Sequence, residues 1–70
     1  MRIQVNGEYR EFDLPLSIQD LIAVLGLRLE RLAIELNGTV IRRVDWADTM
    51  LGDDDRIEIV HFVGGGCWEQ

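Results

Sequence analysis

The chain has 70 residues, of which 47% are hydrophobic and 29% charged, as in one small folded domain rather than a disordered segment. Thirteen acidic residues against seven basic ones give a formal net charge of -6, which argues against nucleic-acid binding because phosphate contacts require a basic surface. A single cysteine excludes an internal disulfide and a multi-cysteine metal site, and it fits the reducing cytoplasm. No apolar run approaches membrane-spanning length, so we expect no membrane association.

A β-hairpin is predicted at the beginning of the chain. Apolar and polar residues alternate over residues 1–5, which is the pattern of a half-buried strand. Asn6 and Gly7 then suit a two-residue type I′ turn, in which both positions need a positive φ. A second strand is expected over residues 9–14.

One amphipathic helix is predicted after the hairpin. Ser17 is a favourable N-cap, and Asp20 three residues later resembles the acid of a capping box. Gly26 is expected at the position that ends the helix. Apolar side chains recur at helical spacing and form one face: Ile18, Leu21, Ile22 and Leu25. A helix this short can cover only one face of a small sheet.

A second hairpin and a final strand are predicted in the rest of the domain. Alternation over residues 32–36 and 39–41 indicates two strands, joined by a second Asn-Gly turn. Trp46 is expected to anchor an irregular segment that contains a single helical turn. The last strand, residues 56–63, reads as apolar on both faces, so we expect it to lie centrally, beside the first strand.

An apolar patch is expected on the face of the sheet that the helix leaves open. It carries either Val60 and Phe62 or Ile57 and Ile59. Such patches often mark the surfaces where partners bind. We take Val60 and Phe62 as the candidate partner-binding surface.

The chain offers no constellation of catalytic or metal-binding residues. His61 is the only histidine and lies inside the last strand, where a packed or surface role is the better interpretation. Three successive aspartates, residues 53–55, do not fit an EF-hand loop and are read as a solvated turn. The three glycines that follow the last strand are not a phosphate loop, because no helix follows them and no lysine is present. We therefore expect no catalytic residue, no metal and no bound cofactor.

The domain is expected to end at residue 63, where a flexible tail, residues 64–70, begins. Glycine lacks a Cβ, so Gly64, Gly65 and Gly66 make a thin leader that can enter a narrow channel of another enzyme. Extended chain from residue 63 to Gly66 reaches about 13 Å. The plain alternative is a frayed terminus.

Four parts of the sequence together resemble the ThiS family, the sulfur carriers of thiamine thiazole biosynthesis: residues 3–7, 33–41, 42–46 and 55–66. The resemblance covers residues 1–66. It implies an α+β, ubiquitin-like β-grasp fold, with a mixed sheet of four to five strands and one main helix packed on one face.

The resemblance also implies a chemistry carried out by partner enzymes. A ThiF-type adenylyltransferase would consume ATP to adenylate the carboxylate of Gly66, with Gly64 and Gly65 threading its active site. Sulfur from a cysteine desulfurase or a rhodanese-like donor would then give a thiocarboxylate, which a ThiG-type thiazole synthase accepts. The open sheet face would dock on the adenylating enzyme.

Two features depart from the family pattern. Residues 67–70 follow Gly66, so its carboxylate is engaged in a peptide bond. We expect a protease to remove this extension by cleaving between Gly66 and Cys67; an N-to-S acyl shift at Cys67 and an inert extension are the alternatives. Asp54 stands where a glycine is frequent, and since aspartate tolerates the left-handed region, we expect the turn to form.

Two other functions remain open at this point. One is sulfur delivery to molybdopterin or to cysteine or methionine biosynthesis. The other is a non-covalent β-grasp interaction module with a tail that has no function.

Overall fold

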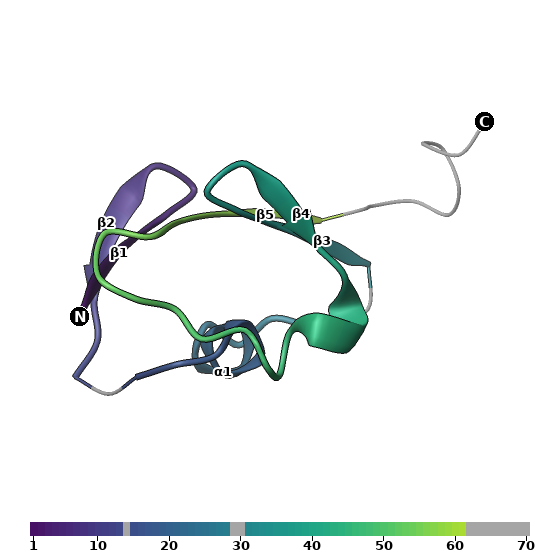
Figure 1. The fold of residues 1–70 in the computed structure, drawn as a ribbon, viewed down its shortest axis with the longest axis horizontal. Helices are drawn as coiled ribbons and strands as arrows, with labels where there is room; N and C mark the ends of the chain where they lie inside the picture. Colours follow the sequence, from purple (N-terminus) through teal and green to yellow (C-terminus); the bar gives the residue numbers. More distant parts are fainter. Residues whose placement is uncertain (14, 29–30, 62–70) are drawn as a thin grey trace.

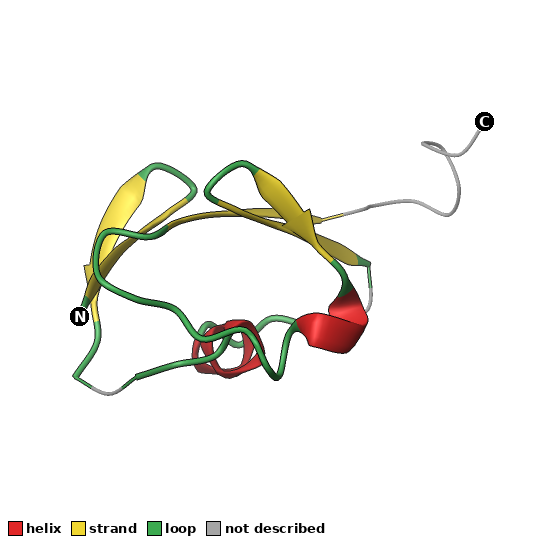
Figure 2. Ribbon diagram, in the orientation of Figure 1, coloured by secondary structure: helices red, strands yellow, loops and turns green. Residues whose placement is uncertain are grey.

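A five-stranded mixed sheet with a single α-helix on one face forms the domain (Figures 1 and 2). The computed structural model describes residues 1–13, 15–28 and 31–61. The predicted α+β architecture is confirmed. In chain order its elements are β1 (Arg2–Val5), β2 (Glu8–Glu11), α1 (Ile18–Val24), β3 (Leu32–Leu36), β4 (Thr39–Ile41), the 3-10 turn η1 (Arg43–Asp45) and β5 (Arg56–His61).

The last strand occupies the centre of the sheet, as predicted. The strand order is β2-β1-β5-β3-β4, with β5 parallel to β1 and antiparallel to β3. Two hairpins therefore lie on either side of β5 (Figure 1). Their turns confirm the predicted type I′ geometry, because both asparagines and both glycines have positive φ: Asn6 50°, Gly7 86°, Asn37 52° and Gly38 89°.

Both ends of α1 are closed as the sequence predicts. The Ser17 hydroxyl accepts from the Asp20 backbone N–H at 3.0 Å, and the Asp20 carboxylate accepts from the Ser17 N–H at 3.1 Å. At the other end Gly26 has φ +74°, and its N–H donates to the Ala23 carbonyl. The next N–H, that of Leu27, reaches back to the third-last helical residue and completes a Schellman motif.

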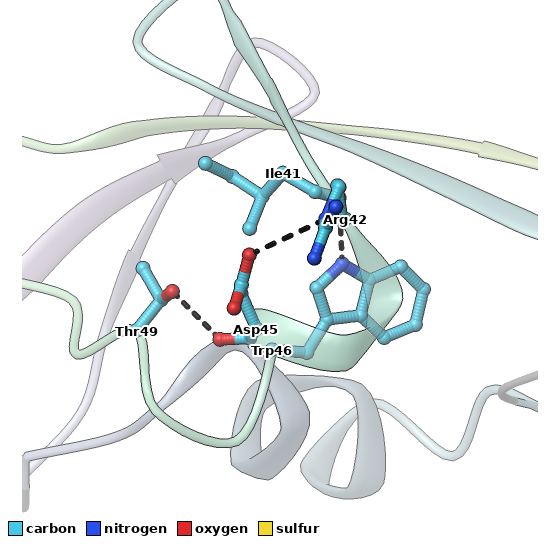
Figure 3. Close-up of polar contacts among 5 residues, drawn as sticks. All are labelled: Ile41, Arg42, Asp45, Trp46 and Thr49. Atoms are coloured by element: carbon cyan, nitrogen blue, oxygen red, sulfur yellow. Dashed lines mark hydrogen bonds and ion pairs between the residues drawn. The ribbon is translucent and has the colours of Figure 1, made fainter.

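Trp46 closes the core beside η1 (Figure 3). Its side chain is 1% exposed, and its indole N–H donates to the Ile41 carbonyl at 2.9 Å. Thr49 donates its hydroxyl proton to the Asp45 carbonyl at 2.7 Å, and Arg42 pairs with the Asp45 carboxylate at 3.7 Å. The rest of the buried apolar core comes from α1, the sheet and Leu51: Ile3, Val5, Ile18, Leu21, Ile22, Leu32, Ile34, Leu51, Ile57 and Ile59.

The second strand is shorter than the predicted residues 9–14. Its pairing with β1 ends at the Arg2–Glu11 pair. Two hydrogen bonds follow it: the Phe12 N–H donates to the Met1 carbonyl at 2.8 Å, and the Met1 amino group donates to the Phe12 carbonyl at 2.9 Å. Because β1 begins at Arg2, which lies opposite Glu11, the strand pairing does not extend β2 further. Leu14 lies outside the described residues.

The turn before β5 forms with aspartate in the left-handed region, as predicted. Asp54 has φ +67°, and its N–H donates to the Arg2 carbonyl at 2.7 Å. In the part of the chain that the structure describes, no helix is long and apolar enough to cross a membrane.

Candidate functional site

The candidate site consists of the open sheet face and the end of β5, from which the C-terminal tail continues. Of its predicted residues, Val60 lies within the described chain. The partner-surface residue Phe62, the glycines Gly64, Gly65 and Gly66, and the processing-site residue Cys67 lie outside the described residues. The geometry of the site therefore comes from β5 and from the elements that flank it.

The two faces of β5 differ in exposure. Ile57 and Ile59 are 1% and 8% exposed and belong to the core beneath the sheet. Val60 is 51% exposed. The helix lies on one side of the sheet and the opposite side is uncovered (Figure 2). Of the two pairs considered for the exposed patch, the structure thus places Val60, and not the isoleucines, on the open side.

The open face carries charge as well as apolar surface. We define the open face by four exposed residues, Glu35, Arg56, Glu58 and Val60, which with Gly38 line a hollow of about 430 Å³. The open face of β5 is mixed within its described residues, because Arg56 and Glu58 share it with Val60 while Ile57 and Ile59 are buried on the other face. A face that the helix does not cover can keep charged side chains in water.

Two carboxylates lie directly opposite one another on the open face. Glu35 of β3 pairs in register with Glu58 of β5, and both are exposed. The ion pairs found among residues 1–13, 15–28 and 31–61 involve other carboxylates, those of Asp54 and Asp45. Like charges at directly opposed strand positions destabilise a sheet. The repulsion between Glu35 and Glu58 is therefore expected to lower the stability of the sheet, and it contributes nothing to the fold.

Glu35→Thr is expected to raise the free energy of unfolding by about 0.5 kcal/mol, because it removes the like-charge contact and places a β-branched residue in a strand. Urea denaturation followed by circular dichroism measures the change. Glu11→Thr is the matched control: it removes the same charge, but Glu11 lies opposite Arg2, so no gain is expected. A Glu35→Thr variant less stable than the parent would contradict the repulsive interpretation.

Two asparagine side chains form hydrogen bonds with the backbone of β5, one on each side of the strand. The Asn6 side chain accepts from the Ile59 N–H at 2.7 Å and donates to the Ile59 carbonyl at 3.3 Å. The Asn37 side chain accepts from the Arg56 N–H at 2.9 Å. Sequence reasoning treated both asparagines as turn formers only. The sequence does contain a signal for these contacts. Both hairpins have asparagine at the first turn position, and its side chain has a donor and an acceptor that can bond to a neighbouring strand.

A second hollow of about 260 Å³ lies beside the end of β5. Its lining includes Leu25 and Leu27 after α1, Asn6 of the first turn, and Ile59 and His61 of β5. His61 is exposed, in agreement with a surface strand residue. Within the described ranges, no three His, Cys, Asp or Glu side chains lie together as metal ligands would.

Among known proteins, this chain is similar to one segment of some much longer proteins and to nearly the whole of some short ones. The thiazole synthase of Magnetococcus marinus is 38% identical over 66 residues, which are 94% of this chain and 20% of that protein. The chain thus spans a fifth of that relative's length. The uncharacterized protein ycf40 of Porphyra purpurea is 42% identical over 64 residues, and the match covers 91% of this chain and 90% of that protein.

Two further matches are to proteins named ThiS. The sulfur carrier protein ThiS of Bacillus subtilis is 44% identical over 50 residues, covering 71% of this chain and 76% of that protein. The crystal structure of the thiamine biosynthesis protein ThiS from Geobacter metallireducens superposes with a TM-score of 0.83 at 33% identity, covering 94% of this chain and all of that one. This match confirms the predicted ubiquitin-like β-grasp fold. The ThiS family model matches residues 3–66. This chain belongs to the ThiS family.

Proposed function

We propose that this protein is a sulfur carrier of thiamine biosynthesis, and that Gly66 is the residue that carries the sulfur. The observation that carries the proposal is the extent of the family match, which runs from residue 3 to residue 66 and so ends on the last of the three glycines. The match with the Bacillus subtilis sulfur carrier agrees with it.

The chemistry takes place on partner enzymes. The Gly66 carboxylate attacks the α-phosphate of ATP on a ThiF-type adenylyltransferase, which gives an acyl adenylate and pyrophosphate. A persulfide on a cysteine desulfurase or a rhodanese-like donor then attacks the acyl carbon with its outer sulfur and displaces AMP, which gives an acyl disulfide. A thiol cleaves the sulfur–sulfur bond of this intermediate, forms a disulfide with the donor cysteine and releases the thiocarboxylate. The carrier contributes the acyl group and the binding surface, while the side chains that catalyse each step belong to the partners.

The position of β5 supports a role in which the carrier presents its tail to the partner enzymes. The strand is central and is paired with β3 from Ile57 to His61. A tail that continues from a central strand starts from a fixed point of the domain. Three glycines then provide a thin connection that enters a channel too narrow for a Cβ.

The open face is the proposed docking surface for the adenylyltransferase. Val60 supplies exposed apolar area, and Phe62 extends it in the sequence-based prediction. Glu35 and Glu58 add two negative charges next to Val60. A partner surface that combines apolar and basic side chains complements this arrangement, and its positive charge relieves the repulsion between the two carboxylates.

The proposed acceptor of the sulfur is a ThiG-type thiazole synthase. Two proteins that are named thiazole synthase, from Magnetococcus marinus and Paramagnetospirillum magneticum, contain a segment similar to this chain that makes up 20% of their length. A carrier-like segment within the same polypeptide as a synthase supports transfer between the two. It also favours thiamine biosynthesis over the molybdopterin and cysteine or methionine pathways.

The proposal includes removal of residues 67–70 by a protease that cleaves between Gly66 and Cys67. A peptide carbonyl at Gly66 lacks the free oxygen that attacks ATP. Intact-mass analysis of the protein isolated from its native cells should therefore find a chain ending at Gly66. Isolation of a fully active protein that still ends at Gln70 would exclude the processing step.

Mass spectrometry after incubation with ATP, a ThiF-type enzyme and a sulfur donor tests the function directly. A chain that ends at Gly66 should gain the mass difference between sulfur and oxygen. The full chain, which ends at Gln70, is the matched control and should keep its mass. Absence of any mass gain in the chain that ends at Gly66 would reject the proposed function.

A further inference from the structure

The central strand is held unequally on its two sides. On one side β3 pairs with five residues of β5, from Ile57 to His61. On the other side the register with β1 contains only two residues of β5, Arg56 and Ile57. The half of β5 from which the tail continues therefore lacks a neighbouring strand on its β1 side.

Asn6 fills part of this gap with its side chain. The chain turns away from β5 at Asn6, whose own N–H still donates to the Ile57 carbonyl at 2.9 Å. From there the carboxamide reaches the next peptide groups along the strand, with bonds of 2.7 Å to the Ile59 N–H and 3.3 Å to the Ile59 carbonyl. A carboxamide has one acceptor and two donor hydrogens, so it replaces the missing peptide group of a longer β1.

Asn37 provides the same kind of contact at the opposite end of β5. Its N–H donates to the Arg56 carbonyl at 2.7 Å, and its side chain accepts from the Arg56 N–H at 2.9 Å. Arg56 begins the strand, so this contact is far from the tail along β5. The fold thus contains two similar asparagine contacts, of which only the one made by Asn6 lies near the origin of the tail.

From this geometry we propose that Asn6 is a positioning residue for the tail: by fixing Ile59 it sets the direction in which the chain leaves the sheet. The inference rests on the proposed function. When the open face is docked on the adenylyltransferase, entry of the tail into the active site is an intramolecular step. Its efficiency depends on how far the position and direction of the first tail residues are restricted. Asn6 thus acts on loading through Ile59, without contact with the reacting carboxylate.

Asn6→Gly is the first variant of the test, in a chain that ends at Gly66. Glycine adopts the positive φ of position 6, so the turn is retained while both side-chain bonds are lost. We expect kcat for thiocarboxylate formation to fall about tenfold, with KM for the carrier little changed, because docking is intact and tail entry is impaired. Hydrogen exchange at the Ile59 amide should become faster.

Two further variants separate positioning from general loss of stability. Asn6→Asp tolerates the left-handed region and keeps the acceptor of the shorter bond, to the Ile59 N–H, but lacks the donor of the 3.3 Å bond to the Ile59 carbonyl. It should therefore recover part of the lost kcat. Asn37→Gly removes the matching contact at Arg56 and should speed exchange there while leaving kcat at the wild-type value. Thermal melts of all variants verify that each is folded.

A tenfold loss of kcat in Asn6→Gly alone, with partial recovery in Asn6→Asp, supports the inference. Equal losses in Asn6→Gly and Asn37→Gly overturn it in favour of a stability effect, and so does an unchanged kcat in Asn6→Gly. If the wild-type chain ending at Gly66 is not loaded at all, the proposed function fails and this inference fails with it.

Discussion

Trp46→Ala is expected to remove a large part of the free energy of unfolding of the domain. The indole is 1% exposed, and its N–H is bonded to the Ile41 carbonyl. Truncating a buried aromatic residue of this size costs about 3–5 kcal/mol. A domain of this length has a total stability of about 4–10 kcal/mol, so the loss consumes a large part of it. The carbonyl of Ile41 also loses its donor in this partly buried contact, which adds to the cost.

Urea denaturation followed by circular dichroism measures this loss without relying on the fluorescence of the deleted tryptophan. Trp46→Phe keeps one aromatic ring but removes the N–H donor and part of the buried volume of the indole, so a smaller loss of about 1–3 kcal/mol is expected. Val44→Ala is the surface control, since Val44 is 68% exposed and its truncation should change stability by less than about 0.5 kcal/mol. A Trp46→Ala variant with the wild-type midpoint would show that the core can dispense with the indole.

A chain that ends at Gly64 is expected to lose sulfur loading completely and to keep its fold. Removal of Gly65 and Gly66 shortens the extended tail by about 7 Å, so its carboxylate stops short of the site that Gly66 would reach. The buried apolar side chains of the described core all come from positions 3 to 59 of the chain. Loading is measured by mass spectrometry with ATP, the adenylyltransferase and a sulfur donor, and stability by urea denaturation.

The chain that ends at Gly66 is the control for this deletion. Both chains end in a glycine carboxylate, so a difference in loading reports the length of the tail and not the chemistry of its terminus. Equal loading of the two chains would contradict the assignment of Gly66. A chain ending at Gly64 that still performs the cellular function would instead support a non-covalent interaction module.

Much of the fold could be predicted because its signals are local. Each Asn-Gly pair specifies a turn, and Ser17 with Asp20 specifies the start of α1, as the structure confirms. The central position of β5 followed from its apolar content. The length of β2 could not be read in this way, because it depends on where the partner strand begins.

The candidate site could be predicted only in part, for a related reason. The exposure of Val60 depends on which face of β5 meets α1, and the sequence left both faces open. The contact between Asn6 and Ile59 joins residues 53 positions apart, and no local pattern announces it. The pairing of Glu35 with Glu58 is likewise a matter of strand register. Tertiary arrangement, and not local propensity, determines these features.

The place of β5 has a consequence for the order in which the protein matures. A ribosome makes this strand after the other four strands of the sheet, yet both hairpins meet at it in the finished sheet. Contacts such as that between Asn6 and Ile59 close a loop that spans most of the chain, so we expect them to form late in folding. The tail is then presented from a fixed origin only after the domain is complete. A partner that recognises the open face together with the tail would thereby select finished carriers over nascent or partly folded chains.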